Sequence, residues 1–537
     1  MERAMLITKR YLNLPVKADA PRQWLRVIVD GKPVSEFEIN LAEGEPDFWS
    51  FIDVLSYRGR KLELQRMGGP EPALPVPVEQ FDEIKGAETI YREKYRPQFH
   101  FSTRRGWIND PNGLVFYAGE YHLFYQHYAF GWSWGTKSWG HAVSTDLVHW
   151  AELPEALSPD HLGDIWSGSA AVDWRNTAGF QRGQEKTIVA IYTAGGDQTP
   201  ASKGLPATQA IAYSTDRGRT WTKYSGNPVV GHIAGYNRDP KVVWHDPTER
   251  WVMALYLDKE GDFQRHALLT SPDLKCWQMR SEVRLPGTGE CPDFFELPVD
   301  GDQANRKWVF WQADGHHMIG SFDGRTFTPE SEPRLAYVGD AYAAQTYSDI
   351  PESDGRRIQI AWLRGDLPGM PFNQQMSFPI ELTLRTTRAG VRLFAYPVQE
   401  IEALRVGTSR CGDLALGLGE PQLVAEGELL DINALFDVGA AARVGLVVRG
   451  VPITYDVEAR TLSCGHYAAA LYPEAGRIWV RVLVDRASVE VFANDGLVSM
   501  PVGIILPEHD RSVKAFAEGG HALLEQLVVH ELRSAWL

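Results

Sequence analysis

The sequence predicts an all-β protein with three parts: a small N-terminal β domain, a large central β domain and a C-terminal β-sandwich. Short segments that alternate polar and apolar residues dominate the chain, and Gly, Asn, Asp and Pro turns separate them. Helical periodicity is scarce. A chain of 537 residues is long enough for two or three domains with their own cores.

The N-terminal domain is expected over residues 1–90. Two alternating segments, 22–41 and 60–67, indicate strands. A proline-rich run then predicts a linker, formed by Pro70, Pro72, Pro75 and Pro77. Three aromatic residues in this region could bind carbohydrate or pack in the domain core and its seam with the next domain, and we favour the core: Phe48, Trp49 and Phe51.

A repeated motif organises the central part, residues 91–398. Ser-X-Asp followed by an aromatic residue occurs four times, with starts 70, 57 and 50 residues apart: Ser144 to Trp150, Ser214 to Trp221, Ser271 to Trp277 and Ser321 to Phe327. A Ser/Asp turn that leads into a strand with a buried aromatic residue is typical of the end of one propeller blade. These four copies, with a fifth strand group over 342–365, predict a five-bladed β-propeller.

The C-terminal part, residues 399–537, again alternates polar and apolar residues. An Asn-Asp-Gly turn at 494–496 lies between two such segments. This pattern predicts an antiparallel β-sandwich.

The charge of the chain excludes some classes of partner. With 54 basic and 69 acidic residues the formal net charge is -15, which argues against nucleic acid or an anionic membrane and suits a neutral substrate. The first residues lack the apolar core of a signal peptide, and the longest apolar runs are too short to span a membrane, so the chain as given is expected to be soluble. Four scattered cysteines show no metal-ligand spacing: Cys276, Cys291, Cys411 and Cys464.

Three carboxylates fall where the innermost strands of the predicted blades begin. They are Asp110 in Trp-Ile-Asn-Asp, Asp239 in Arg-Asp-Pro and Glu290 in Glu-Cys-Pro-Asp. Each motif alone has a structural reading, as a turn, an ion pair or a polar loop. Carboxylates gathered at one channel mouth repel one another and raise each other's pKa, so their joint occurrence favours catalysis.

This set of residues suits cleavage of a glycosidic bond. One carboxylic acid protonates the leaving oxygen, one carboxylate attacks the anomeric carbon, and a third can stabilise the transition state. Ser167 lies in Trp-Ser-Gly-Ser-Ala, which lacks the full Gly-X-Ser-X-Gly pattern and a following helix, so a serine hydrolase is disfavoured. The neighbours His316 and His317 are not expected to bind a metal together, since adjacent strand residues face opposite sides.

Several motifs resemble those of the β-fructosidases of glycoside hydrolase family 32, which includes invertases, inulinases and levanases. These motifs are WINDPNG (107–113), YHLFYQH (121–127), WGHAVSTDLVHW (139–150), WSGSA (166–170), RDPK (238–241), GECPDFFELP (289–298) and DRASVEVFANDG (485–496). The resemblance covers roughly residues 95–537. The N-terminal segment resembles the extra β domain of some bacterial levanase-like members.

The resemblance implies hydrolysis with retention of configuration, without a metal or organic cofactor. Asp110 would be the nucleophile, Asp239 the transition-state stabiliser and Glu290 the acid/base. Retention needs two carboxyl groups about 5–5.5 Å apart, which we expect for Asp110 and Glu290. Arg238 is expected to help keep Asp239 ionised. The implied pocket for the terminal fructose consists of Asn109, Gln126, Trp134, Trp166, Ser167, Arg238 and Trp362.

The chain also departs from the family pattern. Tyr128-Ala129 stand where the family usually has Asn-Pro, and Thr136-Lys137-Ser138 stand where it usually has Asn and then Met or Ile. The lost asparagine is expected near the leaving group, so sucrose recognition need not follow the family. Four aromatic residues could rim the pocket and bind further sugars, or pack against the N-terminal domain: Tyr128, Phe130, Trp132 and Trp134.

The leading hypothesis is therefore an exo-acting fructan hydrolase that releases fructose from levan or inulin. The alternatives with the same chemistry are an endo-levanase and a fructosyltransferase. A non-catalytic fructan-binding protein is a further alternative, disfavoured because binding alone does not require three carboxylates around one sugar. The expected partner is a fructan or fructo-oligosaccharide, and the sequence leaves linkage preference and oligomeric state open.

Overall fold

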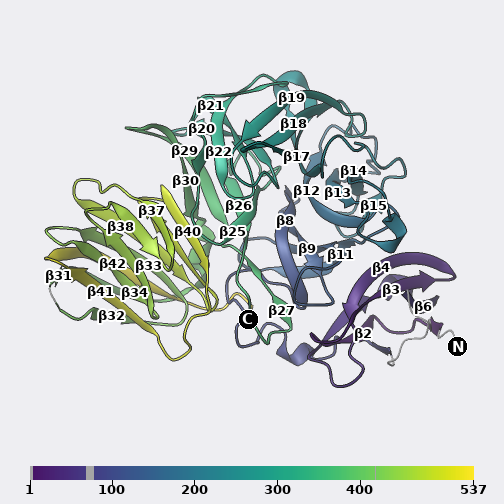
Figure 1. Ribbon diagram of the computed structural model, residues 1–537, viewed down its shortest axis with the longest axis horizontal. Helices are drawn as coiled ribbons and strands as arrows, with labels where there is room; N and C mark the ends of the chain where they lie inside the picture. Colours follow the sequence, from purple (N-terminus) through teal and green to yellow (C-terminus); the bar gives the residue numbers. More distant parts are fainter. Residues whose placement is uncertain (1–3, 68–77, 418, 537) are drawn as a thin grey trace.

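The computed structural model describes residues 4–67, 78–417 and 419–536, and its regular elements are strands β1–β42 with five short 3-10 helices (Figure 1). The helices are η1 (Leu55–Tyr57), η2 (Ala87–Thr89), η3 (Pro200–Ser202), η4 (Asp246–Thr248) and η5 (Gln399–Leu404). The prediction of an all-β protein is confirmed. Within these residues, no helix is both long and apolar enough to cross a membrane. The predicted proline linker lies outside the described residues.

Two small sheets make up the N-terminal region, drawn in purple in Figure 1. The first has the order β1 (Met5–Leu6), β6 (Lys61–Met67), β3 (Arg22–Val29) and β4 (Lys32–Asn40), and the second has the order β5 (Phe48–Asp53), β2 (Tyr11–Val16) and β7 (Glu79–Phe81). Asp30 and Gly31 join β3 to β4, and both have positive φ. This backbone matches the twist of a tight hairpin, and glycine adopts it without steric cost.

Five successive groups of antiparallel strands form the central region (Figure 1). The first group is β8 (Gly106–Tyr117), β9 (Glu120–Tyr128), β10 (Ser138–Ser144) and β11 (Ala151–Leu157), and the second is β12 (Asp164–Asp173), β13 (Thr187–Gly195), β14 (Thr208–Ser214) and β15 (Thr222–Lys223). The third group is β16 (Arg238–His245), β17 (Arg250–Glu260), β18 (Phe263–Ser271) and β19 (Gln278–Leu285), and the fourth is β20 (Asp293–Val299), β21 (Asp302–Trp311), β22 (His316–Phe322) and β23 (Phe327–Pro329). The fifth group is β25 (Ala341–Thr346), β26 (Arg357–Leu363), β29 (Ile380–Thr387) and β30 (Gly390–Pro397). Short strands at their edges are β24 (Arg334–Leu335), β27 (Phe372–Asn373) and β28 (Gln375–Met376).

The first strands of the five groups contact one another in a closed cycle. β8 packs beside β12, β12 beside β16, β16 beside β20, β20 beside β25, and β25 beside β8. The cycle places the starts of these strands, and therefore the three predicted acids, around one centre.

The Ser-X-Asp repeat forms the turn between the third and fourth strands of a group. In the first three copies the serine hydroxyl donates to the aspartate, at 3.0, 2.7 and 3.1 Å. The tryptophan ring N–H of each copy then donates to the carbonyl three residues earlier. In the fourth copy Asp323 instead accepts the backbone N–H groups of Arg325 and Thr326. The repeat is thus a local hydrogen-bonded turn that leads into the outer strand.

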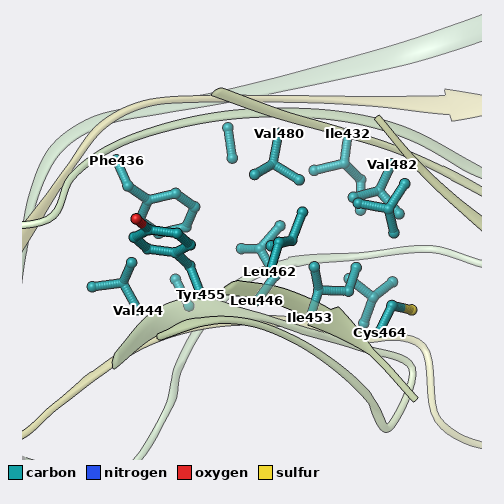
Figure 2. Packing of buried hydrophobic residues seen from close by; sticks show 14 of the residues in the cluster. Ile432, Phe436, Val444, Leu446, Ile453, Tyr455, Leu462, Cys464, Val480 and Val482 are labelled. Carbon is teal, nitrogen blue, oxygen red and sulfur yellow. The ribbon is translucent and has the colours of Figure 1, made fainter. Parts of the chain in front are cut away.

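Two six-stranded sheets pack face to face in the C-terminal region. One has the order β31 (Arg405–Leu416), β42 (Ala522–Leu532), β33 (Leu430–Asp437), β38 (Arg477–Val484), β39 (Ser488–Ala493) and β40 (Val498–Gly503), and the other β32 (Gln422–Glu426), β41 (Ser512–Glu518), β34 (Arg443–Val448), β35 (Val451–Asp456), β36 (Thr461–Cys464) and β37 (Tyr467–Ala470). Figure 2 shows Ile432, Val480 and Val482 of the first sheet above Leu446 and Ile453 of the second. Alternate residues of each strand fill this core, as the sequence pattern predicts.

A buried carboxylate joins the C-terminal sheets to the central region. Asp485, between β38 and β39, accepts the backbone N–H groups of Gln98, Phe99 and His100. Its Oδ2 also lies 2.8 Å from Nδ1 of His100. Burial lowers the pKa of His100, but the hydrogen bond to Asp485 and the nearby Glu490 carboxylate, 3.7 Å from Nε2, outweigh burial and raise this pKa to about 9. The two regions also share one hydrophobic core.

Aromatic residues of the central region complete the core of the N-terminal region. Phe130 stacks on Phe37 with ring centroids 4.0 Å apart, and Trp132 meets Phe48 edge to face at 4.6 Å. Tyr128 is buried in the same cluster. Tyr128, Phe130 and Trp132 therefore pack against the N-terminal region, as one of the two interpretations predicted, and do not rim the pocket. The fourth residue, Trp134, is 60% exposed.

Candidate active site

The three predicted acids lie together at the starts of neighbouring strands. Asp110 is in β8, Asp239 is the second residue of β16, and Glu290 lies just before β20. The Arg238 guanidinium links two of them, since its Nη2 donates to Glu290 Oε1 at 2.6 Å and its Nε lies 3.6 Å from Asp239 Oδ2. Residues far apart in the sequence thus form one acidic cluster.

The innermost strands are irregular where they reach this cluster. Register shifts fall between residues 108 and 111 of β8, 165 and 168 of β12, 238 and 241 of β16, and 342 and 345 of β25. Asp239, Cys291 and Ala343 have φ values of 62°, 46° and 52°. Bulges redirect side chains, and left-handed backbone at residues other than glycine is costly and concentrates at functional sites.

Ser167 and Asn109 both donate hydrogen bonds to Asp110. The Ser167 hydroxyl donates to its Oδ2 at 2.6 Å, and Asn109 Nδ2 donates to its Oδ1 at 3.1 Å. Burial raises the pKa of Asp110, while these two hydrogen bonds lower it and the nearby Glu290 charge raises it, with a net upward shift. Trp107 fixes the amide of Asn109 by donating to its Oδ1 at 3.2 Å.

Asp239 lies deeper and is only 6% exposed. Burial raises its pKa, Arg238 lowers it, and the charges of Glu290 and Asp110 raise it again, to about 7. Arg238 therefore lowers the pKa of Asp239, as expected, but burial raises this pKa by more. The expectation that Asp239 is kept ionised therefore holds only above about pH 7. Thr193 supports the backbone by accepting the Asp239 N–H at 2.8 Å.

Both carboxyl oxygens of Glu290 accept hydrogen bonds. Arg238 binds Oε1, and the Tyr342 hydroxyl donates to Oε2 at 2.6 Å. Tyr342 belongs to β25, on the other side of the cluster, and sequence reasoning missed it. Its position depends on the register shift in β25, and a tyrosine in an alternating segment carries no signal of its own.

Cys291 lies between two of the acids. Its thiol lies 3.3 Å from Asp110 Oδ2 and 3.6 Å from Asp239 Oδ2, and its backbone N–H donates to Asp239 Oδ2 at 3.1 Å. Burial and the three neighbouring carboxylates raise the pKa of the thiol well above its usual value. Cys291 is therefore a neutral S–H donor in this site, a role that its place in the Glu-Cys-Pro-Asp motif did not reveal.

The remaining predicted pocket residues differ in how directly they are linked to this cluster. Gln126 is buried and donates to the Ile165 carbonyl at 3.0 Å, while the Trp166 ring lies against Gly195, where a Cβ atom would meet it at 2.4 Å. Trp362 meets both Trp107 and Tyr342 edge to face. Ser167 and Arg238 contact the acids directly, and Trp134 is exposed at 60%.

Lys137 is an unexpected cation in this environment. It is fully buried, its Nζ donates to the Gly135 carbonyl at 2.9 Å, and the same nitrogen lies 3.6 Å from the centre of the Trp134 ring. Burial lowers the pKa of Lys137 to about 7, against the charges of Asp164 and Asp110, which raise it. It stands in the segment where the sequence departs from the family pattern.

The described residues contain no cluster of three or more His, Cys, Asp or Glu side chains that could hold a metal ion. The cluster offers instead one carboxylate held by a serine and an asparagine, one carboxyl held by an arginine and a tyrosine, and a third, deeply buried acid. Carboxyl groups in such different environments can have different pKa values, so that one donates a proton while another, ionised, acts as a nucleophile.

Comparison with known proteins identifies the family of this chain. Sequence profiles of the glycosyl hydrolases family 32 N-terminal domain and of the family's C-terminal region match residues 100–397 and 400–531. A levanase of Bacillus subtilis (strain 168) is 40% identical over 499 residues, which cover 83% of this chain and 72% of the levanase.

Solved structures match as well. The exo-inulinase from Aspergillus awamori is 29% identical, with a TM-score of 0.74 over 83% of this chain and 100% of that one. A fructofuranosidase from Schwanniomyces occidentalis complexed with fructosylnystose is 26% identical, with a TM-score of 0.72 over 82% of this chain and 98% of that one. The matched profiles and the levanase identity establish the family: the chain belongs to glycosyl hydrolase family 32.

Proposed function

We propose that this protein is a retaining hydrolase of β-fructofuranosyl linkages that releases fructose from the ends of fructans such as levan or inulin. The observation that carries the proposal is the acidic cluster, in which Asp110 and Glu290 have different hydrogen-bond partners. The levanase and exo-inulinase among its relatives support the substrate class.

The fold we propose for the whole chain is a five-bladed propeller over residues 91–398, an N-terminal β domain over 1–90 and a C-terminal sandwich over 399–537. The closed cycle of β8, β12, β16, β20 and β25 supports the propeller. The acids then lie at one mouth of its central channel.

In the first step Asp110 attacks the anomeric carbon of the terminal fructosyl unit while Glu290 gives its proton to the leaving oxygen. The glycosidic C–O bond breaks, the shortened chain leaves as an alcohol, and a covalent fructosyl ester on Asp110 remains. Ser167 and Asn109 orient the attacking carboxylate. Direct attack requires the two carboxyl groups to be about 5–5.5 Å apart, whereas a separation beyond about 6.5 Å would favour inversion.

In the second step Glu290, now ionised, takes a proton from water, and the hydroxide oxygen attacks the same carbon. The bond to Asp110 breaks, fructose leaves with retained configuration, and Glu290 is protonated again. Tyr342 and Arg238 hold Glu290 at both oxygens through the two steps. Asp239 stabilises the oxocarbenium-like transition state through the sugar hydroxyls.

The terminal fructose is proposed to occupy the space between the acids and the surrounding polar and aromatic side chains. These are Asn109, Gln126, Trp134, Trp166, Ser167, Arg238 and Trp362. Trp134 is 60% exposed, and in this proposal it contacts the next sugar of the chain.

Product analysis tests the mode of action. Levan is incubated with the protein and the products are followed by chromatography from the earliest times, with inulin and sucrose in parallel. Exo-hydrolysis predicts fructose alone at every time. An early ladder of oligosaccharides would instead indicate an endo-levanase, and products longer than an oligosaccharide substrate would indicate a fructosyltransferase.

The Asp110→Asn variant tests catalysis against simple binding. It removes the nucleophile but keeps the shape of the side chain, so we expect kcat to fall by about 10³-fold or more while the protein still binds levan. A non-catalytic binding protein would show no fructose release by the unaltered chain in the first place.

A further inference from the structure

A second hollow lies at the other end of the innermost strands. Its volume is about 510 Å³, within the range of roughly 300–1,000 Å³ typical of small-molecule sites. Residues late in β12 and β16 line it, together with the segment 348–352 that follows β25. Ser167 and Asp239 lie near the starts of the same two strands. At about 3.3 Å per residue, the seven residues from Ser167 to Trp174 and the five from Asp239 to Trp244 put the two tryptophans roughly 15–25 Å from the acidic cluster.

Tryptophan side chains form part of the wall of this hollow. Trp174 is 51% exposed, and its ring N–H donates to Asp349 Oδ1 at 2.8 Å. The ring N–H of Trp244 donates to Asp246 Oδ1 at 2.9 Å, and Trp251 packs against it edge to face. The Arg175 guanidinium carbon lies 4.8 Å from the centre of the Trp244 ring, so the half-exposed Trp174 offers the freer apolar face for stacking on a sugar ring.

The charges that line the hollow balance. Arg175, Lys241 and Arg357 face Asp246, Asp349 and Glu352. Arg175 pairs with Asp246 at 2.9 Å, and Lys241 pairs with the buried Asp293 at 3.1 Å. The lining carries as many acidic as basic side chains and therefore no net formal charge, which suits a neutral, hydroxyl-rich ligand.

We propose that this hollow is a second, non-catalytic binding site for a short stretch of neutral fructan chain. The class of sugar rests on the proposed function, whereas the presence of a sugar site rests on the hollow itself. Binding of the polymer at this face would raise the concentration of chain ends near the acidic cluster, so the site should matter for long substrates and not for short ones.

Affinity electrophoresis in gels that contain levan tests this proposal. The protein carries Asp110→Asn so that the levan stays intact, and Trp174→Ala is compared with Tyr472→Ala, a control at a 62% exposed aromatic residue of the C-terminal region. We expect the parent and the control to be retarded equally, and Trp174→Ala to lose about 3- to 10-fold in affinity for levan. Trp244→Ala changes another tryptophan of the same wall and should also lower the affinity for levan. It replaces Trp174→Ala in the test if that variant does not fold.

Kinetics in the active protein separate this site from catalysis. Trp174→Ala should lower kcat/KM for levan and leave turnover of a fructosyl trisaccharide within about twofold. Equal retardation of Trp174→Ala and its parent, or a parent that levan does not retard, would overturn the second site while leaving fructose release untouched. If the unaltered protein released no fructose from any fructan, the proposed function would fail, yet retardation that depends on Trp174 would still support a sugar site here.

Discussion

The Ser167 hydroxyl lies 2.6 Å from Asp110 Oδ2, although the two residues are 57 positions apart in the chain. The contact exists because β12 packs beside β8 and both strands begin at the acidic cluster. Its effect is electrostatic, since the hydrogen bond lowers the pKa of a carboxyl group whose pKa burial raises.

Ser167→Ala should therefore move the acidic limb of the pH–rate profile to higher pH. The nucleophile must be ionised, and without this donor its pKa rises further, by up to about one unit for a hydrogen bond of about 1.4 kcal/mol. We expect kcat/KM to fall about tenfold near the acidic limb and less at higher pH. The measurement is kcat/KM for a fructosyl trisaccharide from pH 4 to 8. Ser169→Ala is the control, because Ser169 donates to the Pro240 carbonyl and not to an acid, and its acidic limb should not move.

Asp239→Asn should make the protein more stable at high pH and less active at every pH. The pKa of Asp239 is about 7 in the folded protein against an ordinary 3.8, so the folded state holds the proton more tightly and stability falls as pH rises from about 4 to about 7. Asparagine does not ionise, so the variant does not lose this free energy of unfolding, which amounts to about 4 kcal/mol at most. Thermal unfolding should give equal Tm values for the two proteins at pH 4 and a higher Tm for the variant at pH 8. Identical values at pH 8 would show that the buried charge is not destabilising.

Lys137→Met should raise KM for short fructans with little change in kcat. The ammonium lies 3.6 Å from the centre of the Trp134 ring, and such a contact contributes about 0.5–2 kcal/mol, or roughly 2- to 30-fold in affinity if Trp134 binds sugar. Because burial lowers the pKa of Lys137, the ammonium loses its charge at a lower pH than an ordinary lysine, and the increase in KM should become smaller as the pH rises. Lys137→Arg keeps the cation and should show a smaller change. An increase in KM that did not depend on pH would rule out the charge as its cause.

Phe130→Ala should destabilise the N-terminal region. Its ring is 9% exposed and stacks on Phe37, and truncation of such a core phenylalanine costs about 3–5 kcal/mol. Scanning calorimetry should show a lower Tm for the transition of that region. Trp134→Ala, four residues later and exposed, should change stability by less than about 1 kcal/mol and provides the matched control.

The strand pattern and the acidic motifs were predictable from local sequence. Alternation predicted β-strands, and the Ser-X-Asp turns are local hydrogen-bonded structures whose residues lie within seven positions of one another. Asp110, Asp239 and Glu290 could be grouped because each follows a turn at the start of a predicted inner strand. Such signals do not depend on knowing which strands become neighbours.

What could not be predicted depends on contacts between strand groups. Tyr342 reaches Glu290 only because β25 closes the cycle beside β20 and shifts its register on the way. Whether Tyr128 and Phe130 faced sugar or the N-terminal region depended on how two regions dock. The pKa of Asp239 depends on the balance between burial and one neighbouring cation, and sequence alone indicated the cation but not the depth of burial.

The Asp485 contact limits how this chain can be cut or recombined. The carboxylate belongs to the C-terminal sheets, yet it accepts hydrogen bonds from three consecutive backbone N–H groups that precede β8. A fragment that ended near residue 398 would leave those amides and the His100 imidazole without their acceptor inside an opened core. The two regions therefore depend on each other for a closed core, so a cut between them exposes buried apolar surface as well as these polar groups.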